Sequence, residues 1–114
     1  MKRNYVPIPN SYLDEMADLS DGEFGCLCRE LMDYSMTGKP VEGKVGKSGL
    51  YAKRVMEVQD KFQAMFDAVD EIDGLDRNHK IKIENAAARY AIYSIIPKSN
   101  DKNLNYVLSK MQAA

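Results

Sequence analysis

The residues whose types and spacing come closest to known chemistry are a Gly-Lys-Ser triplet at 46–48. In nucleotide-binding phosphate loops this triplet ends a segment whose backbone amides cradle phosphate, and an earlier glycine stands five positions before the second one. Val41 occupies that earlier position, and a helix, not the required strand, is expected to end at Gly38. The segment is therefore predicted to be a flexible connection, with Ser48 as the cap of the next helix.

Residues 67–74 resemble a calcium-binding loop in their density of carboxylates. If Gly74 is the required sixth residue of such a loop, Val69 takes the first position and Lys80 takes the twelfth. Both positions need oxygen donors, which neither side chain offers. The single histidine, His79, has no cysteine or carboxylate at metal-ligand spacing. We therefore expect no metal, no cofactor and no catalytic residue, so the protein is predicted not to be an enzyme.

Charge is distributed unevenly along the chain, although the formal net charge is only −1. Residues 1–48 carry six Lys and Arg against eight Asp and Glu, and residues 49–76 carry three against seven. Residues 77–114 carry seven against two, for a net charge of +5. The small net charge therefore hides an acidic middle and a basic final third.

The acidic residues gather near the expected end of a long helix, where the backbone dipole favours cations over anions. Two interpretations follow. Arg77, Lys80 and Lys82, just beyond the turn, could neutralise the carboxylates, or the carboxylates could form an acidic patch that binds a basic protein surface. The residues of this acidic cluster are Asp67, Asp70, Glu71, Asp73 and Asp76.

The basic residues of the final third are candidates for contact with nucleic acid. Lys82, Arg89 and Tyr93 are seven and four positions apart and should share one helix face. A solvated face is one interpretation, and a weak, salt-dependent contact with phosphates is the other. We expect no base-specific contact, because no exposed helix face is predicted to gather Arg, Asn and Gln. The candidate residues are Arg77, Lys80, Lys82, Arg89, Lys98, Lys102 and Lys110.

The elements that must position these residues are all predicted to be helices. With 114 residues, 45% apolar and 29% charged, the chain is expected to form a single helical domain over 1–114. We predict an all-α, compact bundle of four to five helices with one long central helix at about 48–72. A short helical turn should begin at Asn10 and Ser11. The other predicted helices run from a Ser20–Glu23 capping box to Gly38, over 77–96 and over 101–112.

The predicted long helix carries an apolar seam whose members alternate four and three positions apart. Within one chain, only the 77–96 helix is apolar enough to cover the seam. The second half of that helix is apolar nearly all round, so it is expected to be the central and most buried element. The alternative is a coiled-coil dimer through the seam, although a monomer is favoured. The seam residues are Tyr51, Val55, Val58, Phe62, Met65, Val69 and Ile72.

Several features predict a cytoplasmic protein with no membrane association. No segment approaches the roughly 18 apolar residues of a membrane span, and the first residues lead directly into Pro7 and Pro9 without the hydrophobic run of a signal peptide. Cys26 and Cys28 should point about 200° apart on a helix. They are therefore predicted to be buried free thiols in a reducing compartment.

Residues 11–40 resemble a known family. An opening aromatic helix, the Leu19-Ser20-Asp21-Gly22-Glu23-Phe24 start and the Leu31-Met32-Asp33-Tyr34-Ser35-Met36-Thr37-Gly38 close are similar to the uncharacterised N-terminal domain of phage and prophage replisome-organiser proteins of Gram-positive bacteria. The resemblance covers about residues 10–63.

This resemblance implies a phage-encoded protein of the bacterial host cytoplasm, a non-enzymatic binding module associated with DNA replication. Its expected partners are host or phage proteins and, weakly and without sequence preference, nucleic acid. The alternative is a phage inhibitor of a host defence nuclease, similar to an anti-CRISPR protein, that blocks a protein surface.

Overall fold

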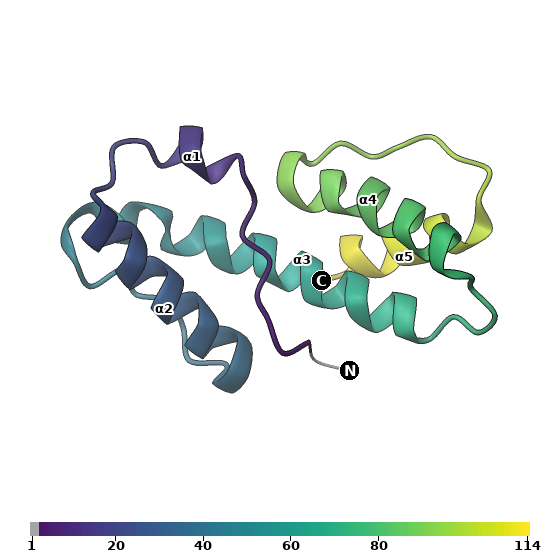
Figure 1. Cartoon of the computed structure of the whole chain (residues 1–114), viewed down its shortest axis with the longest axis horizontal. Coiled ribbons are helices and arrows are strands. Elements are labelled where there is room, and N and C mark those ends of the chain that lie inside the picture. The colour runs from purple at the N-terminus through teal and green to yellow at the C-terminus, as the bar shows by residue number, and fades with distance from the viewer. Residues whose placement is uncertain (1–2) are drawn as a thin grey trace. The chain divides into compact units, whose positions relative to one another are not determined.

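A computed structural model describes residues 3–114, and it confirms the predicted all-α class (Figure 1). No strand occurs anywhere in 3–114. The elements are α1 (Tyr12–Glu15), α2 (Asp21–Thr37), the 3₁₀ helix η1 (Gly46–Tyr51), α3 (Ala52–Asp70), α4 (Arg77–Tyr93) and α5 (Lys102–Gln112).

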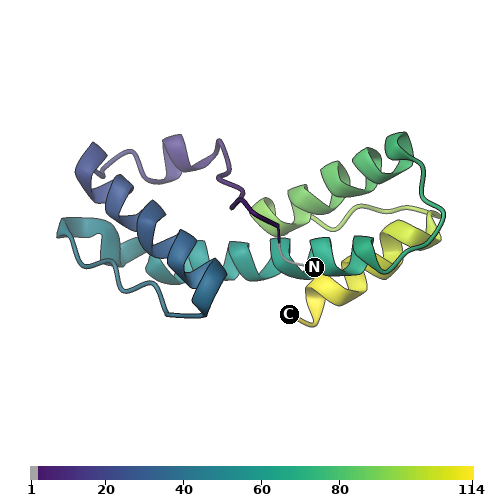
Figure 2. The same ribbon diagram turned by 60° about the horizontal axis from the view of Figure 1, so that its bottom comes forward.

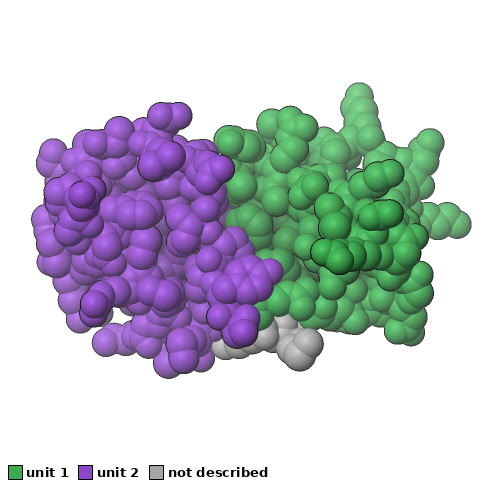
Figure 3. Space-filling model, viewed as in Figure 1, with its two compact units in different colours: residues 1–3, 60–114 green, residues 4–59 purple. Residues whose placement is uncertain are grey.

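The chain divides into two compact units, which are described separately (Figure 3). One unit is formed by residues 4–59 and the other by residue 3 with residues 60–114. Helix α3 supplies its first half to the former and its second half to the latter.

Helix α2 begins and ends as its sequence predicts. The Ser20 hydroxyl accepts a hydrogen bond from the Glu23 amide at 3.1 Å, and the Glu23 carboxylate accepts one from the Ser20 amide at 2.8 Å. At the other end, Gly38 adopts a left-handed conformation with φ of 80°. The predicted capping box and glycine terminus are both confirmed.

The core of the 4–59 unit is formed by α1, α2 and the start of α3. Val55, a seam residue, packs there and is 1% exposed. Since the helices at this position are α1 and α2, the expectation that only the 77–96 helix could cover the seam is wrong. The buried cluster comprises Tyr12, Met16, Leu27, Leu31, Val41, Ala52 and Val55.

The 60–114 unit contains the second half of α3 together with α4 and α5, and α4 packs on α5. The connection over 94–101 returns from the end of α4 to the start of α5 (Figure 2). The apolar residues of α5 are spaced i, i+3, i+4 and i+7, which places them on one helix face, and all four are buried. The buried residues of these two helices are Ile83, Ala87 and Ala91 in α4 and Leu104, Val107, Leu108 and Met111 in α5.

Two predicted helix boundaries are wrong. The α-helical part of the long helix begins at Ala52, not at Ser48, which lies inside η1 and donates its hydroxyl proton to the Val45 carbonyl at 2.6 Å. The predicted 77–96 helix ends at Tyr93, because Ser94 takes a left-handed conformation with φ of 58°.

The predicted 77–96 helix is also not the most buried element. Ile95 and Ile96 lie beyond the end of α4 and are about half exposed, and within α4 Ile81 and Tyr93 are exposed as well. The most buried element is instead helix α3. Its buried residues are Ala52, Val55, Val58, Gln59, Phe62, Met65, Phe66, Ala68 and Val69.

Candidate functional site

The Gly-Lys-Ser segment is held by carboxylates of α2. Oε1 of Glu30 accepts hydrogen bonds from the amides of Glu42 and Gly43, at 2.9 and 3.2 Å. Oε2 accepts from the Lys44 amide and from the Cys26 thiol, both at 3.3 Å. Burial alone raises the pKa of Glu30, but the three amides and the thiol outweigh it, so the pKa lies below its usual value.

A second glutamate completes this arrangement. The carboxylate of Glu23 accepts from the Lys47 amide as well as from the Ser20 amide, and these bonds lower its pKa. The loop must pass very close to it: Gly46 has φ of 50°, and a Cβ there would overlap the Glu23 carboxylate.

The chain's own carboxylates therefore take the place that a phosphate would need. Four amides of residues 42–47 point at Glu23 and Glu30 instead of at an open anion site. This arrangement agrees with the prediction that the segment is a connection and not a phosphate loop.

The five residues of the acidic cluster are all exposed, and several have contacts within the 60–114 unit. Asp70 forms an ion pair with Arg3 at 3.1 Å, and the Arg3 guanidinium lies 4.8 Å from the centre of the Phe66 ring. Asp67 accepts from the Gln63 side chain at 2.9 Å, and Glu71 accepts from the Tyr106 hydroxyl. The contact between Asp70 and Arg3 joins residues far apart in sequence, and no local pattern predicts it.

Asp76 does not belong to the end of α3, contrary to its grouping with the acidic cluster. It is the N-cap of α4, and its carboxylate accepts from the His79 amide at 2.8 Å. A carboxylate at a helix N-terminus is stabilised by the backbone dipole. One of the five carboxylates is therefore explained by a structural role.

His79 pairs with Asp101, the N-cap of α5. The His79 Nε2 atom lies 2.6 Å from Oδ2 of Asp101, while Oδ1 accepts from the amides of Asn103 and Leu104. The hydrogen bond with His79 is the main reason that the pKa of Asp101 lies below its usual value. The pair links the first turn of α4 to the first turn of α5. Among residues 3–114, no group of three His, Cys, Asp or Glu could hold a metal ion.

The seven basic candidates are spread over the 60–114 unit. Arg77, Lys80, Lys82 and Arg89 are in α4, Lys98 is in the connection, and Lys102 and Lys110 are in α5. Lys80 is half buried and the other six are exposed. The Lys110 ammonium lies 5.5 Å from the centre of the Tyr106 ring. Lys80 and Lys82 are about 200° apart around the axis of α4, so the seven residues do not share one face.

One narrow face of α4 does gather polar residues. Residues 78, 82, 85, 89 and 93 fall within about 80° around the helix axis, and all are exposed. We call this face the α4 stripe: Asn78, Lys82, Asn85, Arg89 and Tyr93. The expected Lys82, Arg89 and Tyr93 face therefore exists, whereas the expectation that no exposed helix face combines Arg with Asn is wrong. The i, i+4, i+7, i+11 and i+15 spacing was readable in the sequence.

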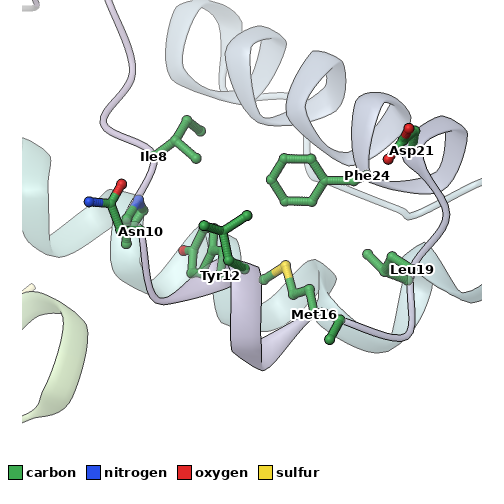
Figure 4. A pocket seen from close by; sticks show the side chains of 10 residues that line it. Ile8, Asn10, Tyr12, Met16, Leu19, Asp21 and Phe24 are labelled. Carbon is green, nitrogen blue, oxygen red and sulfur yellow. The ribbon is translucent and has the colours of Figure 1, made fainter.

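An apolar groove in the 4–59 unit was not anticipated. It encloses about 440 Å³ between the segment before α1, α1 itself and the first turn of α2. Figure 4 shows Ile8 and Phe24 on opposite sides of this space, with Tyr12, Met16 and Leu19 below them. The lining residues are Ile8, Pro9, Asn10, Tyr12, Leu13, Met16, Ala17, Leu19, Asp21 and Phe24. No sequence signal marks a concavity, because it depends on how three segments are placed.

Cys26 and Cys28 are free, as predicted, although both are half buried and not fully buried. Burial raises the pKa of Cys28, and for Cys26 the bond to Glu30 is the main cause of a raised pKa. Neither thiol therefore has the lowered pKa that marks a reactive cysteine.

Comparisons with protein-family models, with curated proteins and with solved structures gave no match. No helix within residues 3–114 has the length and apolar character needed to cross a bilayer.

Proposed function

We propose that this protein is a non-enzymatic binding module that makes a weak contact with nucleic acid phosphates through the α4 stripe. The observation that carries the proposal is the exposure of Lys82 and Arg89 on one helix face, together with the aromatic ring of Tyr93. Cations beside an aromatic side chain can contact phosphate and stack on a base or sugar.

The charge around α4 is mixed at its start and positive toward its end. Asp73 and Asp76 are exposed just before α4, next to Arg77, Lys80 and Lys82 in its first two turns. Arg89 and Tyr93 lie toward the other end, and Lys98 follows in the connection. A contact limited to a few phosphates binds weakly and loses affinity with salt, because each neutralised phosphate contributes about −0.9 to the slope of log K against log salt.

The resemblance of residues 10–63 to phage replisome-organiser proteins supports a replication-associated role in a phage-infected bacterium. The acidic cluster supports the alternative, inhibition of a host defence nuclease, because Asp67, Glu71 and Asp73 are exposed at the end of α3 and in the turn after it. An exposed group of carboxylates can compete with nucleic acid for a basic groove on another protein.

Fluorescence anisotropy tests the nucleic-acid contact. Labelled single-stranded and duplex DNA of about 20 nucleotides is titrated at about 25 mM and about 150 mM salt. We expect weak binding at low salt that falls at the higher salt and is reduced by Lys82→Ala and by Arg89→Ala. Lys53→Ala is the matched control, because the Lys53 side chain is 88% exposed and lies in α3, outside the α4 stripe.

Sequence-selective binding that survives moderate salt would contradict a contact made only with phosphates. Binding that is unchanged in both α4 variants would show that the α4 stripe does not contact DNA. The inhibitor would be favoured if the chain prevents a basic nucleic-acid-binding protein from binding its DNA. This effect should then be lost in Asp73→Lys but kept in the α4 variants.

A further inference from the structure

We infer that the apolar groove of the 4–59 unit is a docking site for a short amphipathic helix of another protein, one with apolar anchor residues flanked by Lys or Arg. The inference rests on the proposal that the chain is a binding module, but it does not depend on any contact with nucleic acid. The groove and the α4 stripe belong to different units.

The groove is an apolar concavity whose surface continues onto exposed side chains. Ile8 is 42% exposed and Leu13 is 80% exposed, although their neighbours Tyr12 and Met16 are only 3% exposed. Burial also raises the pKa of Tyr12 to about 12. Single exposed leucines are common. An exposed leucine beside a hollow of about 440 Å³ is the arrangement that receives an anchor side chain.

A small molecule explains this surface less well than a peptide. The volume lies within the range of about 300–1,000 Å³ for ligand sites. Such sites need converging polar groups to orient a ligand, and only Asn10 and Asp21 among the lining side chains are strongly polar. Leu13 lines the hollow and is 80% exposed, and a helix laid along the groove would bury it.

The charge around the groove selects the partner's chemistry. Residues 4–28 contain five Asp and Glu and no Lys or Arg. Glu15 pairs with Arg54 at 3.0 Å, and Glu23 is used by the 42–47 loop. Asp14, Asp18 and Asp21 are exposed, and Asp21 lines the groove itself. An apolar surface with an acidic rim is complementary to a helix that carries Lys or Arg beside its apolar residues.

The same charges disfavour the other occupants. A second copy docked on this surface by two-fold symmetry would bring two acidic rims together, which is unfavourable. Nucleic acid would bring phosphates to the same carboxylates. A basic amphipathic helix therefore fits the apolar surface and the charge at once.

The test uses the full-length ¹⁵N-labelled protein and three synthetic helical peptides of about 16 residues. The first has Leu and Phe at i, i+4 and i+7 with Lys beside them. The second has Glu in place of each Lys, and the third has Ser in place of each apolar residue. We expect amide shifts within residues 8–24 with the first peptide, and much weaker effects with the other two.

Variants of the protein make the result specific to the groove. Leu13→Lys and Asp21→Lys should each lower the affinity for the Lys peptide by about tenfold. The first removes an apolar contact and the second removes an attractive charge. Both residues are exposed, so the variants should fold. Leu50→Lys is the matched control, because Leu50 is 73% exposed and does not line the groove, and it should leave affinity unchanged.

Several results would overturn the inference. These are equal binding of the Glu peptide, shifts that map outside residues 8–24, absence of binding by the Lys peptide, or affinity that Leu13→Lys leaves unchanged. Sedimentation that shows a dimer lost in Leu13→Lys would assign the groove to a second copy. DNA binding is measured on the same variants and should be unaltered in them, so a failure of the nucleic-acid proposal and a failure of the groove are distinguishable.

Discussion

Substitution of Glu30 by Gln isolates the bonds that hold the 42–47 loop. Gln keeps the size of the side chain but replaces one oxygen by an NH₂ group. If its oxygen keeps the place of Oε1, it still accepts from the amides of Glu42 and Gly43. The NH₂ group then faces the Lys44 amide and the Cys26 thiol, which are donors themselves, so those two bonds are lost.

The expected cost follows from these four contacts. A hydrogen bond to a charged group contributes about 1.5–3 kcal/mol, against about 0.5–1.5 kcal/mol for a neutral one. Two bonds would be weakened and two would be lost, but Glu30 is only half buried and water replaces part of what is removed. We therefore expect Glu30→Gln to lower the free energy of unfolding by about 2 kcal/mol.

Urea unfolding followed by circular dichroism measures this change, and its pH dependence tests the cause. The pKa of Glu30 is lower in the folded protein than its usual value of 4.5. The carboxylate therefore stabilises the fold fully above pH 4.5, and this contribution is lost as the pH falls through the lower folded pKa. The variant should show a flatter loss of stability on the acid side.

Glu57→Gln is the control, because Glu57 is 53% exposed and makes only an i, i+4 pair with Lys53 at 3.7 Å. It should change the free energy of unfolding by less than about 0.5 kcal/mol. Equal effects of the two substitutions, or an unchanged acid profile in Glu30→Gln, would refute the reasoning.

Three further perturbations test other parts of the structure. Phe62 is 6% exposed, so Phe62→Ala should lower the free energy of unfolding by about 3–5 kcal/mol. The melting temperature of the wild type should not rise with protein concentration, whereas a dimer through the seam would make it rise. Asp101→Ala should cost about 1 kcal/mol as a lost helix cap. It should also remove stability that the wild type loses as the pH falls from 3.8 through the lower folded pKa of Asp101; an unchanged acid profile would count against the His79 pair. Gly46→Ala should cost at least about 1–2 kcal/mol because of its positive φ, and full stability in thermal unfolding would argue against the close approach to Glu23.

Local signals in the sequence predicted α2 and α5 well. Ser20, Glu23 and Gly38 act within one or two turns of the helix ends that they define. The apolar i, i+3, i+4 and i+7 spacing placed Leu104, Val107, Leu108 and Met111 inside. These features depend on neighbours in sequence, so a single sequence contains them.

What was mispredicted depends on contacts between distant segments. The start of the long helix moved to Ala52 because a turn of 3₁₀ helix precedes it, next to a loop held by glutamates at 23 and 30. The first half of the seam found its partners in α1 and α2, not in α4. The groove exists only because Ile8, Leu13 and Phe24 converge from three segments. Spacing along one element contains no information of this kind.

The two glutamates that hold the 42–47 loop have a consequence for how relatives of this chain should be recognised. The loop's course is fixed by main-chain amides, so the exposed side chains of Glu42, Lys44 and Lys47 are free to change during evolution without altering it. The carboxylates are not, nor is Gly46, whose Cβ would overlap Glu23, nor Gly43, whose Cβ would overlap the Gly49 backbone. A distant relative should therefore keep Glu, Glu, Gly and Gly at the spacing of 23, 30, 43 and 46, even where the overall sequence identity has been lost.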